Sequence, residues 1–183
     1  MPLYQNTSVN TGALVVGNYK IEMAASVGAT YVNLGAGMIN KWGQNITKYA
    51  IQAGNAPDPL EGISNETFTI DGELIEFDLS VLSVLSCGGF TSASSGTVMT
   101  ASGGGNATLT PYVFRLTNKR MVSGATKETI ILVYNGTLDT GLQVTAKSDN
   151  DSDPINVIPF TITAKLDTTR TAGSQLFYIT KTI

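Results

Sequence analysis

The sequence predicts an all-β protein, an antiparallel β-sandwich or partly closed barrel with one short helix packed on it. Three observations lead to this fold class. Apolar and polar residues alternate with a two-residue period in several stretches. Turns rich in Gly, Asn and Pro separate these stretches. Thr, Ser, Asn and Gly replace charged residues, which make up only 14% of the chain. We expect about nine strands.

Length and composition indicate one domain. A chain of 183 residues is long enough for a real hydrophobic core, and we place this β-sandwich domain at residues 18–183. Residues 1–17 are mostly polar and are expected to form a flexible N-terminal arm that becomes ordered against a neighbour. No signal peptide is evident in them, and no stretch approaches the roughly 18 apolar residues of a membrane span. The single cysteine excludes an internal disulfide.

The first strands are expected to form a hairpin. Residues 19–22 alternate between apolar and polar, a turn follows around Gly28, and residues 30–34 provide the second strand.

Residues 35–65 are predicted to form a long assembly loop or hairpin. Their apolar side chains are interspersed with Asn, Gln and Gly. Trp42, the only tryptophan of the protein, either fills the core at the end of a sheet or anchors a subunit contact, because Trp and Tyr dominate interface hot spots. The candidate subunit-interface residues are Met38, Ile39, Trp42, Ile46, Tyr49 and Ile51.

Residues 65–90 begin as a strand and end as a helix. Phe68 and Ile70 form the apolar side of the strand, and the two-residue period breaks near Leu74. Asp78 is a suitable N-cap for a short helix over residues 79–87, which we expect to cover the sheet. The polar side of the strand consists of Thr67, Thr69, Asp71 and Glu73.

The second half of the chain is predicted to consist of strands and turns. Residues 91–106 are rich in Gly and Ser, so a mobile loop is expected there. Residues 119–127 are expected to form a basic connection, and Asn135-Gly136 is a strong turn signal. Residues 130–134 are apolar on both faces, which is typical of a strand covered on both sides. The strands expected here cover residues 112–117, 130–134, 138–146, 158–165 and 176–183.

The sequence disfavours catalysis. The chain has no histidine, which removes Ser-His and Cys-His pairs and the commonest metal ligand. Cys87 lies in the apolar helical stripe, where a buried thiol is expected. Residues 149–153 have alternate aspartates, but the glycine and glutamate of a calcium loop are missing. Glu73 and Glu76 leave a carboxylate hydrolase as one alternative. We predict a non-enzyme without catalytic, cofactor-binding or metal-binding residues.

Three segments together resemble the tail tube (major tail) proteins of long-tailed bacteriophages. Residues 17–22 with 28–35, GNYKIE and GATYVNLG, are similar to the opening hairpin of that family. Residues 66–89 resemble its central strand and small helix. Pro159-Phe160-Thr161 and Leu176-Phe177-Tyr178-Ile179 are similar to its closing strands.

The resemblance implies hexameric rings stacked into a hollow tube in the virion tail, assembled in the host cytoplasm. Genomic DNA passes through the lumen without specific binding, which agrees with a net charge of −3 and the lack of a basic patch. Residues 35–65 then reach a neighbouring subunit, and the polar side of residues 67–73 lines the lumen or a subunit seam. The implied partners are further copies of the chain, the tape measure, the tail terminator and the tail tip. The alternatives are a tail terminator, a capsid decoration protein or an adhesin.

Overall fold

The computed structural model describes residues 18–51, 60–75, 90–95, 98–103, 108–122, 124–139, 143–145 and 156–182, and it contains no helix in these ranges. Nine strands make up the described part. They are β1 (Tyr19–Ala24), β2 (Val32–Ile51), β3 (Leu60–Leu74), β4 (Phe90–Ser95), β5 (Val98–Gly103), β6 (Tyr112–Val122), β7 (Ala125–Leu138), β8 (Ile158–Lys165) and β9 (Phe177–Lys181). The all-β prediction is confirmed.

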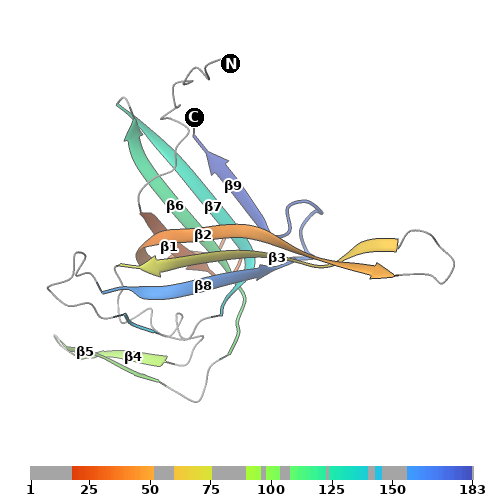
Figure 1. Cartoon of the computed structure of the whole chain (residues 1–183). Helices are drawn as coiled ribbons and strands as arrows, with labels where there is room; N and C mark the ends of the chain where they lie inside the picture. The colour runs from red at the N-terminus through yellow and green to blue at the C-terminus, as the bar shows by residue number, and fades with distance from the viewer. Residues whose placement is uncertain are drawn as a thin grey trace, which may run out of the picture.

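Seven strands form one antiparallel sheet in the order β6-β1-β2-β3-β8-β7-β9, and β6 also pairs with β7. This pairing joins strands near the two ends of the sheet, so the sheet curls into a partly closed barrel. β7 is the junction. Its residues Gly136–Leu138 pair with β8, whereas Thr129–Val133 pair with β9 on the same edge. Figure 1 shows β6, β7 and β9 crossing behind the layer of β2, β3 and β8.

The core lies between these two layers. Alternate residues of β3 and β8 point inward and pair across the strands, such as Ile70 with Ile162 and Phe68 with Ala164, and all four are fully buried. Ile131 and Val133 of β7 are buried as well, while Ile130 and Leu132 on the other side of that strand are only half-buried. The expectation that this run is covered on both sides is therefore wrong in part.

Asn135-Gly136 does not form the expected turn. It lies inside β7, at an irregularity in the pairing with β6, where Asn135 adopts a left-handed conformation with φ of 48°. A Cβ on Gly136 would lie 2.9 Å from the ring of Phe114 and 3.1 Å from Ile162. A bulge requires a backbone conformation that Asn and Gly adopt more easily than other residues, and Gly136 leaves room for the core side chains beside it. The dipeptide that favours a hairpin turn therefore forms a bulge here and bends β7.

Two further expectations are corrected by strand pairing. Residues 91–106 were expected to be a mobile loop, but β4 and β5 pair along their whole length as a separate two-stranded sheet. Residues 119–127 were expected to be a connection, but they extend β6 and β7, which pair up to Val122 and Ala125. Backbone hydrogen bonds form without apolar side chains, so neither of these strand pairings could be predicted from amino-acid composition. The expected helix over 79–87, the expected arm over 1–17 and Asp149–Asp153 lie outside the described residues.

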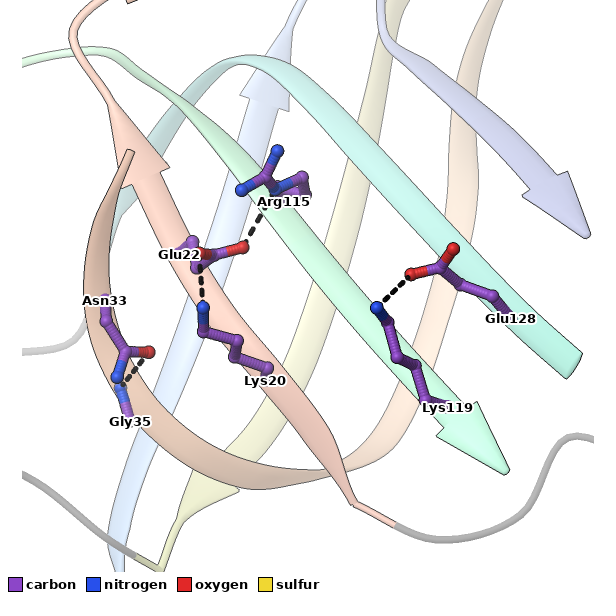
Figure 2. Close-up of polar contacts among 7 residues, drawn as sticks. All are labelled: Lys20, Glu22, Asn33, Gly35, Arg115, Lys119 and Glu128. Carbon is purple, nitrogen blue, oxygen red and sulfur yellow. Dashed lines mark hydrogen bonds and ion pairs between the residues drawn. The ribbon is translucent and has the colours of Figure 1, made fainter. Parts of the chain in front are cut away.

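One buried carboxylate is held on the outer side of β1. Glu22 accepts hydrogen bonds from Lys20 Nζ at 2.7 Å and from Arg115 Nε at 2.8 Å (Figure 2). The Arg115 guanidinium stacks on the ring of Tyr31 at 3.9 Å. Burial raises the pKa of Glu22, but the hydrogen bonds from Arg115 and Lys20 outweigh it, so its pKa lies below the usual range. The hydrogen bond from the guanidinium to Glu22 also raises the pKa of Arg115.

This cluster predicts a component of acid sensitivity. Because the folded-state pKa of Glu22 is depressed, its stabilisation is present above the unfolded-state pKa and is lost as pH falls through the folded value. Glu22→Gln is expected to lower the free energy of unfolding at pH 7 by about 1–2 kcal/mol. The difference from the wild type should shrink between about pH 5 and pH 3. Urea unfolding across this pH range measures both effects.

Glu128→Gln is the matched control. Glu128 pairs with Lys119 at 3.2 Å, but Lys119 is exposed and Glu128 is only half-buried, and ion pairs near the surface contribute about 0–1 kcal/mol. An equal loss in both variants at pH 7 would contradict the role given to Glu22.

Candidate functional site: the β2–β3 arm

The hairpin of β2 and β3 extends beyond the barrel. β1 pairs with β2 only up to Gly37, and β8 pairs with β3 only from Thr67 to Leu74. Residues Ile46–Ile51 and Leu60–Glu66 therefore pair only with each other among the described residues. We call this two-stranded extension the arm. It spans six residues of β2, about 20 Å at the rise of a strand, and it projects to the right of the barrel in Figure 1.

The arm exposes apolar side chains on both faces. Directly paired residues share a face, and the register places Ile46 with Glu66 on the face that continues the core, while Ile63 joins that face opposite Lys48. Tyr49 lies on the other face opposite Gly62. The exposed fractions of the large apolar side chains are Trp42 48%, Ile46 49%, Tyr49 45%, Ile51 56% and Ile63 59%. This exposure is unusual for a part of the chain with regular strand structure.

Aromatic rings anchor the arm where it leaves the barrel. Trp42 packs against Phe68 with ring centroids 6.0 Å apart, and Phe68 stacks on Phe177 of β9 at 4.3 Å. Gln44 Nε2 donates a hydrogen bond to Glu66 Oε1 beside them. Gln44, Glu66 and Phe177 also line a cleft of about 240 Å³. Trp42 therefore packs against the core residue Phe68 and remains half-exposed. This position is compatible with both roles that the sequence left open, filling the core and anchoring a subunit contact.

The structure separates the six candidate interface residues into groups. Met38 is opposite Glu73 on the outer face of the barrel, and Ile39 packs against the core. Neither belongs to the arm. Of the other four, Trp42 and Ile46 share the core-side face, and Tyr49 and Ile51 lie towards the tip.

Ile63 was missed by the sequence analysis, although it is the most exposed large apolar residue of the arm. The register shift between Thr47 and Lys48 leaves Ser64 unpaired opposite β2. Such a bulge interrupts alternation, so the strand pattern around Ile63 is obscured in the sequence.

The four polar residues of β3, Thr67, Thr69, Asp71 and Glu73, share the outer face of the barrel, where all are half-buried. Their neighbours are polar as well. Asp71 Oδ1 accepts a hydrogen bond from Thr161 Oγ1 at 2.9 Å, and Thr69 Oγ1 accepts one from Asn45 Nδ2 at 3.1 Å. The outer face of β2, β3 and β8 therefore carries hydroxyl and amide groups together with two carboxylates, Asp71 and Glu73, and two lysines, Lys41 and Lys165.

Opposite charges gather at two distant parts of the molecule. On the arm, Glu61 and Glu66 belong to β3, and Lys48 belongs to β2. The end of the sheet formed by β6, β7 and β9 carries four cations and one carboxylate. These are Lys119, Arg120, Lys127, Lys181 and Glu128.

Within the described ranges, no three His, Cys, Asp or Glu side chains gather as a metal site would require. The same part of the chain has no helix with the length and apolar character needed to cross a membrane. No protein-family model matches the chain, and a search of curated proteins found no match. The arm is the candidate functional site, because it exposes large apolar side chains on regularly paired strands.

Substitution of Gly62 tests whether packing of Tyr49 stabilises the strand pairing of the arm. A Cβ at this position would lie 2.5 Å from ring atoms of Tyr49, so Gly62→Ala must displace that ring. In this variant, the backbone amides of Tyr49 and its neighbours are expected to show faster hydrogen–deuterium exchange. The exchange rates of amides in β7 and β8 should remain unchanged, since the arm lies outside the core.

Gly43→Ala is the control in the same hairpin, because a Cβ there meets no atom within 4 Å. Equal exchange in the two variants would show that Tyr49 does not order the arm.

Proposed function

We propose that this protein is the subunit of a phage tail tube, which self-assembles into stacked sixfold rings around a hollow lumen. The observation that carries the proposal is the arm. A hairpin that leaves the barrel with Trp42, Ile46 and Ile63 accessible on one face gains little in an isolated subunit, because its apolar side chains stay in water. Contact with a neighbour would bury them. The resemblance of three segments of the sequence to tail tube proteins supports the same function.

The composition of the outer face of the barrel is compatible with a lumen through which DNA passes. Thr67, Thr69 and Thr163 place hydroxyl groups there, with Asp71 and Glu73 beside them. Lys41 and Lys165 share this face and balance the two carboxylates, so the face is mainly neutral, and such a wall neutralises few phosphates and lets DNA move along it without being retained. We propose that this face lines the lumen or a seam between subunits. The proposal does not require that any single residue bind DNA.

The symmetry of the contact also agrees with a tube. We propose that each arm binds a different surface of the next copy without reciprocal exchange, which makes the contact heterologous. A heterologous contact closes into a ring when its rotation divides a full turn, and it grows a filament otherwise. Low charge favours close packing, because only 14% of the residues are charged and little charge must be desolvated.

Trp42→Ala is expected to leave a folded monomer and to weaken assembly. Truncation of an aromatic hot spot costs about 2 kcal/mol or more, which corresponds to a rise of about 30-fold in the concentration needed for assembly. Negative-stain electron microscopy and sedimentation measure the assembly, and circular dichroism measures the fold. In the wild type, emission of this single tryptophan should shift to shorter wavelength as rings form, since its exposed edge becomes buried.

Leu109→Ala is the control, because Leu109 is exposed and lies outside the arm. A wild-type protein that stays monomeric at high concentration, even with tail-initiation components, would contradict the tube function. Particles that stop at single rings would favour a tail terminator instead. Loss of fold and assembly together in Trp42→Ala would assign Trp42 to the core alone.

A further inference from the structure

The loop between β8 and β9, residues 166–176, is folded on itself. Asp167 N donates a hydrogen bond to Gln175 O at 3.1 Å, which closes the two ends of the loop. Within it, Arg170 N donates to Asp167 O at 3.1 Å, and Gln175 Nε2 donates to Arg170 O at 3.1 Å. Compact surface loops with close ends are frequently functional. The shape of this loop is set by its own hydrogen bonds before any partner binds.

Contacts with β7 hold the loop against the barrel. Asn135 Nδ2, at the bulge, donates to Leu166 O at 3.4 Å. The Arg170 guanidinium lies over the ring of Tyr134, 3.7 Å from its centroid, and its Nε donates to Ser174 O at 3.1 Å. These contacts orient the guanidinium through one side of the group. Its terminal NH₂ groups are the ones that bind a carboxylate through parallel hydrogen bonds.

The loop lines a cleft of about 350 Å³ at one end of the barrel, which we call the loop cleft. Arg170 and Asp167 contribute a cation and a carboxylate to it. Val27, which is 55% exposed, and Tyr112 contribute apolar surface from the β1–β2 turn and from the start of β6. Asp167 Oδ1 accepts hydrogen bonds from the amide and the hydroxyl of Thr169 at 3.1 and 2.6 Å, which orients the carboxylate. The loop cleft therefore presents a cation, an anion and an apolar side chain together.

The core-side face of the arm presents the same three kinds of group. Lys48 is opposite Ile63, and Ala50 is opposite Glu61, so these side chains share one face. Lys48 and Glu61 are exposed, and Ile63 is 59% exposed. Neither charge forms an ion pair with another described residue. One carboxylate, one cation and one apolar side chain on the arm thus complement those of the loop cleft.

We infer that the core-side face of the arm of one copy docks into the loop cleft of a second copy. The contacts are Glu61 with Arg170, Lys48 with Asp167 and Ile63 with Val27. Ion pairs near a surface fix the orientation of a contact more than they add affinity, and burial of Ile63 supplies the apolar contribution. This inference rests on the proposed self-assembly and names the surface that receives the arm.

The arm of the same chain cannot occupy its own loop cleft. Glu66, at the root of the arm, lines the other cleft beside the loop, together with Gly173 and Gln175. Glu61 lies about 17 Å farther out along the extended strand β3, on the part of the arm that points away from the barrel in Figure 1. The occupant is therefore a second copy.

Carbodiimide cross-linking tests the contact in the wild-type chain, because this reagent joins an amine to a carboxylate only where the two touch. Unlabelled and isotope-labelled protein are mixed before assembly, so that mass spectrometry separates links between copies from links within one. A link between copies from Lys48 to Asp167 is expected. Lys119 is the control amine, since it is exposed and lies about 24 Å along β6 from Tyr112 in the cleft. It should give no link to Asp167.

Charge exchange gives a second test in the full chain. Glu61→Arg places like charges together and is expected to raise the concentration needed for assembly roughly two- to fivefold. Arg170→Glu in the same chain should restore assembly, which a purely structural role of Arg170 would not do. Asp139→Arg is the control, because Asp139 is exposed and lies outside the arm and the loop cleft. It should have no such effect.

The outcomes separate the contact from the tube function. Rings that form without the expected link, or without restoration by Arg170→Glu, overturn the inference and leave the tube function standing. The expected link without rings supports the contact and contradicts the tube. The absence of both the link and rings contradicts both.

Discussion

The backbone hydrogen bonds of β7 determine most of the architecture. One edge of this strand pairs with β6, which closes the barrel, and the other edge is divided between β8 and β9. Because β8 and β9 share an edge, they must separate, and among the described strands β9 pairs only with β7. The bulge at Asn135 lies next to the point of division and bends the strand there. Backbone polar groups inside a protein must be paired, so the course of β7 determines which strands close the barrel and which one leaves it.

Strands with one apolar face could be predicted from the sequence. β8 shows clean alternation, and its inward residues Ile158 and Ile162 are buried as the pattern indicates. Local turn signals were less informative. Asn135-Gly136 favours a turn in isolation, but packing of Gly136 against Phe114 and Ile162 makes it a bulge inside a strand. The Ser- and Gly-rich strands β4 and β5 were not predicted, because backbone pairing between strands does not depend on amino-acid composition.

The candidate site was predictable in location and less so in detail. The segment 35–65 is distinctive in sequence because a solitary Trp and scattered apolar residues occur among Asn and Gln. The sequence does not show that β3 continues past β8, which is a property of the register between Thr67 and Lys165. Ile39 was grouped with Trp42, and the bulge between Ile39 and Lys41 does place both on the core-side face, opposite Gly72 and Ile70. They differ in position along β2, because Ile39 packs against the core and Trp42 lies at the root of the arm. A bulge changes which residues share a face of a strand. Its position cannot be predicted from the alternation of apolar and polar residues, because the bulge itself interrupts that alternation.

The continuity of β3 from the arm into the barrel has a mechanical consequence. Residues Leu60–Glu66 and Thr67–Leu74 are one strand, and its inner half is paired on both sides, with β2 and with β8. A pull on the arm along its axis therefore acts parallel to β3, whereas the hydrogen bonds lie perpendicular to it. Such a load shears many bonds at once and does not peel them open one after another. A subunit held by its arm would resist tension with the strength of its central sheet.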